Sequence, residues 1–368
     1  MHILSLRLHD FRSYRQVMLS PPKGATVFVG ENGAGKTNLL EAVHLCCLGR
    51  SHRTSADKEM IREGQETAAV QVKVQREDGV DEVGVRLYSP AAHKRKVLYI
   101  NGKTASRTGE LMGHVTCVMF SPEDLDIVRG APQGRRRFLD MLLSQCGKGY
   151  FYALQQYNNA LKQRNALLHE IVRGASAATL DAWDEQLCTA AVPVVKARQY
   201  AVQKLTGYAQ EHYAHIGGRA QEQFSLRYEG HLAESLQPAE DLLKLLHERR
   251  QEDIRRATTT AGPHRDDLFL SLSGRDARAF ASQGQMRTAV LSMRLAELDM
   301  LKNRSGEAPL LLLDDVLSEL DGGRRTRLLE RIAGVQTLLT CTDLSDLADA
   351  KPEAVLRVQG GEITEAHG

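Results

Sequence analysis

The chain has 368 residues, 42% of them hydrophobic and 26% charged, which is typical of a globular protein with one large or two coupled domains. It contains no run of about 18 apolar residues and begins without a signal-peptide pattern, so we expect no membrane span and no secretion. Six cysteines without CxxC pairs or disulfide-framework spacing argue against a cysteine-bound metal and for a reducing compartment. The formal net charge of +2 excludes a general electrostatic argument for nucleic-acid binding.

Two β-hairpins are predicted in the first third of the chain, after a strand whose leucines alternate at positions 4, 6 and 8. Valines alternate over residues 70–74, apolar residues alternate again over residues 83–87, and the pair Asp78-Gly79 lies between the two runs. This arrangement is typical of a hairpin. Val97–Ile100 leads into Asn101-Gly102, the strongest two-residue turn signal, which predicts the second hairpin.

Helices are predicted across the middle of the chain, roughly residues 135–257. Apolar residues recur there at helical spacing over residues 154–172 and 183–208. Pro193 lies within the second pattern and is expected to break or kink that helix, because proline lacks a backbone N–H and its ring clashes with the preceding turn.

The last third of the chain returns to strands and helices. Leu310–Leu313 is a short apolar run bounded by Pro309 and Asp314, which predicts a fully buried parallel strand. Residues 335–339 predict another strand. A terminal hairpin is predicted around Gly360-Gly361.

The segment Gly30–Thr37 matches the Walker A pattern GxxxxGK[ST] without a mismatch, between an apolar run over residues 25–29 and the predicted helix Asn38–Val43. Its glycines let backbone N–H groups converge on phosphates, and the helix N-terminus adds the positive end of its dipole. Lys36 is expected to reach the β and γ phosphates, and the Thr37 hydroxyl to ligate Mg²⁺. The residues expected to bind ATP here are Gly30, Glu31, Asn32, Gly33, Ala34, Gly35, Lys36, Thr37 and Asn38.

An acidic pair follows the predicted strand Leu310–Leu313, as in a Walker B motif. An acidic residue at the end of a buried strand can hold Mg²⁺ and its water shell, and a second one beside it can orient or deprotonate the attacking water. We assign Asp314 to the metal and Asp315 to the water.

Between the two Walker motifs, Ser282-Gln283-Gly284-Gln285 opens an apolar helix. A serine and a glycine at a helix N-terminus form a second place for an anion, so Ser282, Gly284 and Gln285 are expected to contact nucleotide. The segment resembles the ABC signature motif, which in such proteins caps the γ-phosphate held by the other subunit. It therefore implies a dimer with two ATP molecules at the interface, and residues 317–321 resemble the D-loop that accompanies it. The candidate catalytic residues are Lys36, Ser282 and Asp315.

Several stretches spread over nearly the full length resemble the bacterial RecF family of recombination mediators. They are residues 8–14, the Walker A loop, residues 122–140, residues 262–267 and residues 313–321. Such proteins are ABC-type ATPases related to the heads of structural-maintenance proteins and Rad50. The resemblance implies an α/β fold, with a P-loop ATPase head containing a mixed sheet and β-hairpins, and an inserted, mainly α-helical arm.

The resemblance also implies function. ATP and Mg²⁺ would close a homodimer on double-stranded DNA near gaps, at single/double-strand junctions, and slow DNA-stimulated hydrolysis would reopen it. A RecR-type mediator protein would be the partner through which the recombinase is loaded, in recombinational repair, replication-fork recovery and the SOS response. We accordingly expect a cytoplasmic, nucleoid-associated protein without a membrane partner.

The stretch between the Walker A loop and the signature segment is too long for a compact ABC head and too short for the coiled-coil arms of structural-maintenance proteins. A compact helical arm fits both limits. We expect the head to comprise residues 1–134 and 258–368, and the arm residues 135–257.

Some positions depart from the wider ABC pattern. Asp315 stands where many ABC proteins carry glutamate, and its shorter side chain predicts slow hydrolysis. Ser121–Asp124 takes the place of the Q-loop without a glutamine, and the strand ending at Asp343 lacks the switch histidine of transporters. Arg12 resembles the N-terminal arginine that related heads place near the phosphates, so it is expected to bind nucleotide.

Basic clusters are the candidates for DNA contacts, which would be salt-sensitive and independent of sequence. Clusters of this size are usually solvated faces. Aromatic residues make up only 5% of the chain and are not interleaved with these charges, so stacking platforms for single strands are not expected. The candidates are Lys94, Arg95 and Lys96 on a predicted hairpin, Arg135 and Arg136 at the start of the arm, and Arg249, Arg250, Arg255 and Arg256 near its end.

Two other functions are compatible with the Walker motifs. One is the ATP-hydrolysing subunit of a membrane transporter, against which the arm and the stretch 122–140 argue. The other is a nucleotide-gated scaffold in which hydrolysis is insignificant, and substitution of Asp315 by asparagine would distinguish it from a recycling clamp.

Overall fold

The structure is a computed structural model that describes residues 1–218, 221–347 and 351–365. The chain divides into two compact units. The first comprises Met1–Asp124, His215–Arg219 and Leu291–Gly368, and the second comprises Leu125–Ala214 and Ala220–Val290. Residues 258–290, expected with the head, thus group with the helical residues, and the head-and-arm boundaries at 134/135 and 257/258 stay a prediction.

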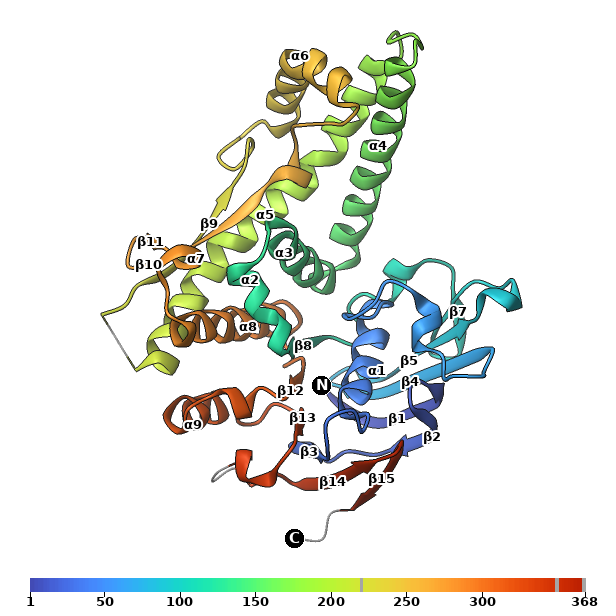
Figure 1. The fold of residues 1–368 in the computed structure, drawn as a ribbon, viewed down its shortest axis with the longest axis vertical. Helices are drawn as coiled ribbons and strands as arrows, with labels where there is room; N and C mark the ends of the chain where they lie inside the picture. Colours follow the sequence, from blue (N-terminus) through green and yellow to red (C-terminus); the bar gives the residue numbers. More distant parts are fainter. Residues whose placement is uncertain (219–220, 348–350, 366–368) are drawn as a thin grey trace. The chain divides into compact units, whose positions relative to one another are not determined.

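The first unit contains an antiparallel sheet of six strands in the order β2-β1-β4-β5-β6-β7 (Figure 1). Both predicted hairpins are confirmed, β4 with β5 and β6 with β7. Asn101 and Gly102 have φ values of +49° and +76°, as a tight two-residue hairpin turn requires. The strands are β1 (His2–Phe11), β2 (Tyr14–Leu19), β4 (Thr67–Arg76), β5 (Gly79–Tyr88), β6 (Val97–Ile100) and β7 (Lys103–Ala105).

A register shift between Ile3 and Ser5 changes which residues of β1 face the core. Ile3, Leu6 and Leu8 are buried, whereas Leu4 is not, because the extra residue moves the side-chain alternation by one position. The alternating leucines therefore predicted the strand but only part of its inner face.

The second sheet of this unit is mixed, in the order β15-β14-β3-β13-β12-β8. All pairs are parallel except the terminal hairpin of β14 and β15, which is confirmed. Every residue of β12 is buried, as predicted for a parallel strand covered on both faces. The strands are β3 (Ala25–Val29), β8 (Cys117–Phe120), β12 (Leu310–Asp314), β13 (Thr337–Cys341), β14 (Ala354–Gln359) and β15 (Glu362–Glu365).

Helix α1 (Lys36–Leu48) contacts β4 and β5 of the first sheet and β12, β13 and β8 of the second. Almost all of its side chains are buried, which fits a helix enclosed by two sheets rather than an amphipathic surface helix. The unit also contains α9 (Gly322–Arg331) and the short 3₁₀ helices η1 (Asp57–Met60), η2 (Pro90–Ala92), η3 (Thr108–Leu111), η6 (Leu317–Glu319) and η7 (Leu344–Leu347).

The second unit is mainly helical, but it contains a three-stranded antiparallel sheet in the order β11-β10-β9. Strand β9 (Phe224–Glu229) lies in the stretch predicted to be helical, and it pairs with β10 (Asp267–Leu272), which in turn pairs with β11 (Arg275–Asp276). The helices are α2 (Asp126–Arg129), α3 (Pro132–Cys146), α4 (Lys148–Val172), α5 (Leu180–Gly217), α6 (Pro238–Arg256), α7 (Ala277–Phe280) and the short η5 (Pro263–Arg265). Two further helices, η4 (Pro122–Leu125) and α8 (Gln283–Ser305), span boundaries between the two units at residues 124/125 and 290/291.

Helix α5 continues through Pro193, so a break there is wrong, whereas a kink stays a prediction. Losing one helical hydrogen bond at a proline costs about 3 kcal/mol. Ala191, Val194 and Val195 beside it are fully buried, and burying each of the two valines stabilises by about 1.5–3 kcal/mol. Packing therefore outweighs the local preference.

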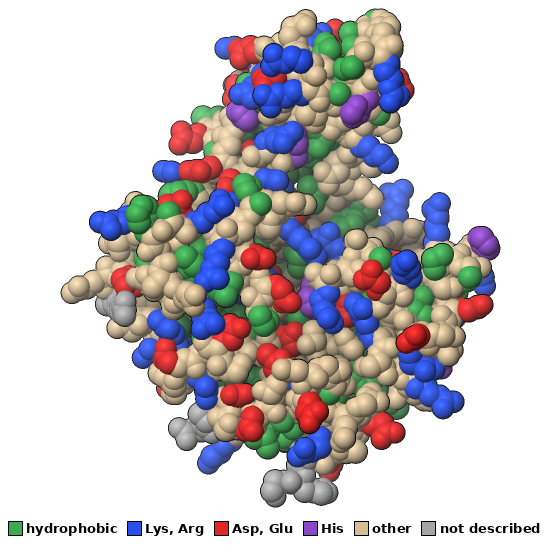
Figure 2. Space-filling model, in the orientation of Figure 1, with side chains coloured by type: hydrophobic (Ala, Val, Ile, Leu, Met, Phe, Trp, Pro, Cys, Tyr) green, Lys and Arg blue, Asp and Glu red, His purple; other side chains and the backbone are tan. Residues whose placement is uncertain are grey.

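None of the helices in the described ranges has the length and apolar character needed to cross a membrane. Figure 2 shows Lys and Arg side chains mixed with Asp and Glu over the visible face, in keeping with the small net charge.

Candidate nucleotide site

The Walker A loop connects β3 to α1 in the first unit and has the backbone shape of a phosphate cradle. Gly33 and Gly35 have φ values of +82° and +111°, a region that glycine enters without strain. A Cβ at Gly30 would lie 2.3 Å from the Val358 carbonyl oxygen, and one at Gly35 would lie 2.7 Å from Ser13 Oγ. No described side chain caps the N-terminus of α1, so its first N–H groups are available to an anion.

Lys36 extends back over this loop. Its Nζ donates to the carbonyl oxygens of Gly30 at 2.7 Å and Glu31 at 3.2 Å, and the residue is only 4% exposed. The ammonium group is thereby held on the rim of the loop, where it can pair with phosphate oxygens.

Asp314 at the end of β12 meets Thr37 at the start of α1. Its Oδ1 accepts hydrogen bonds of 2.8 Å from both Thr37 Oγ1 and Thr340 Oγ1. Burial raises the pKa of Asp314, and the charges of Asp315 and Glu123 act in the same direction, although the two hydroxyl bonds oppose them. A buried carboxylate beside a threonine hydroxyl is a donor set that fits Mg²⁺, whose charge would favour the ionised form.

Asp315 follows with a φ of +50°, in the left-handed region that Asp tolerates better than most residues. Its N–H donates to Thr340 Oγ1 at 2.9 Å, so Thr340 fixes both acidic residues. Sequence reasoning missed Thr340, although a threonine on the strand expected beside the Walker B strand was the available signal.

Arg12 lies on the turn between β1 and β2, where its guanidinium binds a buried carboxylate of α1. Arg12 Nε and Nη2 donate to Glu41 at 2.8 and 2.7 Å, and Nη1 donates to the Glu59 carbonyl oxygen at 2.6 Å. Ser51 Oγ also donates to Glu41, at 2.5 Å. Burial alone would raise the pKa of Glu41, but the bonds from Arg12 and Ser51 and the Arg12 charge hold it below its ordinary value. Contact of Arg12 with nucleotide stays a prediction.

Arg53 is a cation at this site that the sequence did not single out. Its Nη1 donates to Asn38 Oδ1 at 3.2 Å, next to Thr37, and the side chain is 43% exposed. Asn38 also donates to Ser13 Oγ at 3.2 Å. The segment after α1 and the β1–β2 turn thus both reach the Walker A helix.

In the segment expected to replace the Q-loop, Asp124 is buried and binds Arg294 through Nε at 3.0 Å and Nη2 at 2.5 Å. Glu123 is exposed, and its charge acts on both Asp314 and His52.

Ser282, Gly284 and Gln285 belong to the second unit, whereas the Walker residues belong to the first. Ser282 N donates to Gln285 Oε1 at 2.8 Å, and Gln285 N donates to Ser282 Oγ at 3.3 Å. This reciprocal pair caps the N-terminus of α8. Gln285 Nε2 also donates to Glu222 at 2.9 Å. Ser282 is exposed at a well-defined helix N-terminus, as a residue that contacts a phosphate from outside must be.

The expected DNA-contact residues differ in how exposed their side chains are and in whether they already bind other groups of the protein. Arg135 is 4% exposed and forms bonds of 2.6 and 2.8 Å to Asp267, so the structure contradicts its role as a surface contact. Arg136 Nη1 donates to the Asp266 carbonyl oxygen at 2.6 Å. Lys96 pairs with Asp57 at 3.1 Å. Lys94 and Arg95 are exposed, and Lys94 Nζ lies 5.6 Å from the centre of the Tyr88 ring.

Further along the chain, Arg250 is engaged too, because it binds both Asp181 and Asp184. Arg256 pairs with Glu252 at 2.8 Å one helical turn away. These α6 arginines serve intramolecular contacts of the second unit. No pattern in the sequence indicates these acidic partners, and Asp181 and Asp184 lie far from Arg250 along the chain.

The P-loop, the buried Walker B strand and the mixed sheet define an ABC-type ATPase domain, and the family model described as the RecF/RecN/SMC N terminal domain matches residues 2–359. The chain is 41% identical to a DNA replication and repair protein RecF of Symbiobacterium thermophilum, covering 99% of this chain and 98% of that protein. It is 42% identical to the protein of that name from Gloeobacter violaceus, with 99% and 98% covered. The chain belongs to the RecF family.

Solved structures agree with this assignment. The recombination mediator protein RecF of the RecFOR pathway, in structures with ATP and with ATPrS, superposes with a TM-score of 0.92 at 31% identity, covering 100% of this chain and 98% of that one. A Smc head domain from Pyrococcus furiosus matches with a TM-score of 0.58 at 16% identity, covering 99% and 96%, and shows the common fold. The predicted α/β ABC-type fold is confirmed.

Proposed function

We propose that this protein binds ATP with Mg²⁺ at Gly30–Thr37 and acts on DNA in replication and recombinational repair. The observation that carries the proposal is the Thr37–Asp314 pair at 2.8 Å, which places a hydroxyl and a buried carboxylate beside an uncapped helix N-terminus. Full-length relatives named DNA replication and repair proteins, and a RecF structure with ATP at a TM-score of 0.92, support it. The same relatives favour it over the transporter function.

ATP acts in this proposal as the link between two copies of the chain. Lys36, Thr37 and Asp314 of one protomer hold the nucleotide and the metal, and Ser282 and Gly284 of its partner cap the γ-phosphate at the N-terminus of α8. Support comes from the exposed, reciprocally capped Ser282, whose helix N-terminus suits an anion supplied from outside.

Hydrolysis then reopens the dimer. Asp315 orients the attacking water, and its short side chain makes turnover slow enough to time the release of DNA. The closed dimer binds double-stranded DNA near gaps and passes the recombinase onto it through a RecR-type mediator protein. The similar structures are those of a recombination mediator protein of the RecFOR pathway, which supports this partner.

The test is the solution mass of the protein without nucleotide, with ATP and Mg²⁺, and after addition of duplex DNA. We expect ATP to double the mass and DNA to join the doubled species. Lys36→Met should abolish doubling through loss of nucleotide, and Ser282→Arg should abolish it while ATP binding persists. A monomer under all conditions would rule out the shared site, and a dimer indifferent to Ser282→Arg would rule out its signature residues.

A further inference from the structure

The outer face of the antiparallel sheet in the first unit carries basic and polar side chains. Alternate residues of β4, from Ala68 to Val74, are buried against the core and α1, and the intervening residues therefore point outward. The same alternation exposes Arg7 on β1 and Arg86 on β5. We name the set Arg7, His9, Gln71, Lys73 and Arg86 the basic sheet face.

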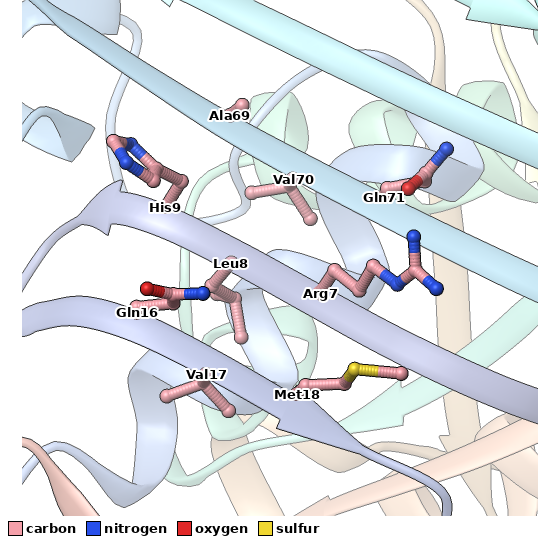
Figure 3. A pocket seen from close by; sticks show the side chains of 9 residues that line it. All are labelled: Arg7, Leu8, His9, Gln16, Val17, Met18, Ala69, Val70 and Gln71. Carbon is pink, nitrogen blue, oxygen red and sulfur yellow. The ribbon is translucent and has the colours of Figure 1, made fainter.

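A shallow groove crosses this face over β2, β1 and β4, with a volume of about 330 Å³ (Figure 3). Strand register places Arg7 between Met18 and Gln71, and His9 between Gln16 and Ala69. Figure 3 shows Arg7 and Gln71 extending side by side from neighbouring strands. Polar side chains of Arg7, His9, Gln16 and Gln71 line this solvent-open groove together with apolar residues such as Met18 and Ala69.

Three cations of the basic sheet face take part in no ion pair among the residues that the structure describes. Arg7, Lys73 and Arg86 form no ion pair with any described residue, in contrast to Lys96 and Arg135, which do. The acidic residue that faces outward among them, Glu82, stands opposite Lys73 in the register. Arg86 lies 6.0 Å from the centre of the Tyr99 ring, a cation–π contact that orients it without removing its charge.

The spacing of these cations suits a phosphate backbone. They lie on β1, β4 and β5, which are neighbours in the sheet. Adjacent strands are about 4.8 Å apart and each residue advances a strand by about 3.4 Å. Because Arg86 pairs with Ala69, four residues from Lys73, the backbone positions of the three cations span roughly 14 Å. A DNA duplex carries one charge per about 1.7 Å of its axis, which offers several phosphates over that length.

We propose that the basic sheet face binds the phosphodiester backbone of duplex DNA. Arg7, Lys73 and Arg86 neutralise phosphates, and the amides of Gln16 and Gln71 donate to phosphate oxygens. The contacts reach no base edge, so binding is independent of sequence. This inference rests on the proposed DNA-binding function and assigns it a surface other than the Lys94–Lys96 hairpin.

The test uses the full chain carrying Arg7→Gln, Lys73→Gln and Arg86→Gln together, with ATP and Mg²⁺. Binding of a fluorescent duplex is measured from about 50 to 200 mM salt, the range over which phosphate contacts dominate. We expect at least a tenfold weaker affinity at low salt. The slope of log K against log salt should become shallower by about 2 to 3, because each lost phosphate contact removes about 0.9.

The matched control carries Lys94→Gln, Arg95→Gln and Lys96→Gln. We expect the sheet variant to keep the thermal stability and the DNA-free ATP hydrolysis of the natural chain, and the hairpin variant to retain most of the DNA affinity. The opposite ranking would overturn the inference. Unchanged DNA binding by the sheet variant would overturn the inference as well. This holds even if the same variant no longer binds an acidic protein, which would make the basic sheet face a protein-binding surface instead. Failure of the natural chain to bind DNA would instead refute the proposed function.

Discussion

Thr37 and Asp314 are separated by 277 residues of chain, yet the Thr37 hydroxyl donates to the Asp314 carboxylate over 2.8 Å. Thr340 donates to the same oxygen from the neighbouring strand β13. The two hydroxyls hold a buried carboxylate whose pKa burial has raised, so its ionised form is costly until a cation arrives. The burial of this carboxylate therefore costs stability that a bound Mg²⁺, as proposed above, would offset.

Asp314→Asn should separate these two effects. The amide keeps an oxygen for the two hydroxyls but removes the charge, so the thermal midpoint without nucleotide should be unchanged or higher. Loss of the metal ligand should cost several kcal/mol in the transition state, which lowers Mg²⁺-dependent ATP hydrolysis by about 100-fold or more. Steady-state phosphate release measures this. Thr37→Ser is the matched control that keeps the hydroxyl, and full hydrolysis by Asp314→Asn would exclude Asp314 as the metal ligand.

Replacement of Asp315 by asparagine should preserve the structure but abolish ATP hydrolysis. Its φ of +50° is accessible to Asp and Asn at low cost and less so to Glu. Asp315→Asn should keep the unfolding free energy within about 0.5 kcal/mol, bind ATP and persist as a dimer because hydrolysis is lost. Asp315→Glu should lose about 1 kcal/mol. Denaturant titration and single-turnover hydrolysis measure both. Normal ATP hydrolysis by Asp315→Asn would show that Asp315 takes no part in the reaction.

The Arg12–Glu41 pair is a buried ion pair beside the Walker A loop, and breaking it should destabilise the first unit. Glu41→Ala leaves Arg12 uncompensated, which should cost about 3–5 kcal/mol. The double substitution with Arg12→Ala should cost less than the sum, because the two residues act together. The pKa of Glu41 is below its ordinary value, so its stabilising effect is present above that value and is lost as pH falls through the lowered pKa.

Denaturant unfolding at pH 7 and pH 4 tests this pair. The Glu41→Gln variant, which keeps the shape without the charge, should lose less stability than Glu41→Ala and show a weaker dependence on pH. Additive effects of the two alanine substitutions would show that the pair contributes no coupling.

Asp266 in the second unit should contribute to the free energy of unfolding with a pH dependence opposite to that of Glu41. Burial raises its pKa to about 6, although the hydrogen bond from Tyr228 and the charges of Arg198 and Arg136 lower it. The folded state therefore binds the proton more tightly than the unfolded chain. The contribution is present below about pH 4, and stability is lost as pH rises through about 6, by roughly 2–3 kcal/mol in all.

The measurement is the difference in unfolding free energy between the natural chain and Asp266→Asn from pH 4 to pH 7. Taking a difference is necessary because burial lowers the pKa of the neighbouring His264 to about 4, which makes its own contribution rise over the same interval. Asp266→Asn should gain stability relative to the natural chain as pH increases. A flat difference would show that Asp266 titrates alike in the folded and unfolded states.

Local signals predicted the hairpins and the nucleotide loop well. Asn101-Gly102 specifies a turn that few other pairs can make, and the Walker A glycines specify a loop with positive φ. In both cases a few consecutive residues determine the local structure, so the sequence alone predicts it. The buried strand β12 was predictable for the same reason, since four consecutive leucines suit only a position covered on both sides.

Other features depend on partners far away in sequence. Arg135 read as a surface cation because its partner Asp267 lies 132 residues further on. Strand β9 was missed because its partner β10 follows α6, and a single strand among helices gives no periodic signal of its own. The register shift in β1 reflects pairing with β4 rather than any residue of β1 itself. Thr340 and Arg53 lie at the nucleotide site only because the fold brings them there, so their position could not be predicted from neighbouring residues.

The order of strands in the mixed sheet also determines when the nucleotide site can come into existence. Both neighbours of β3, the strand that carries the Walker A loop, are β13 and β14 from the end of the chain. At about 5–20 residues per second, synthesis takes on the order of tens of seconds to reach them. Through that time the apolar residues of β3 have no strand to pair with. The nucleotide site can therefore form only after β13 and β14 have been synthesised, and β3 is open to aggregation until then.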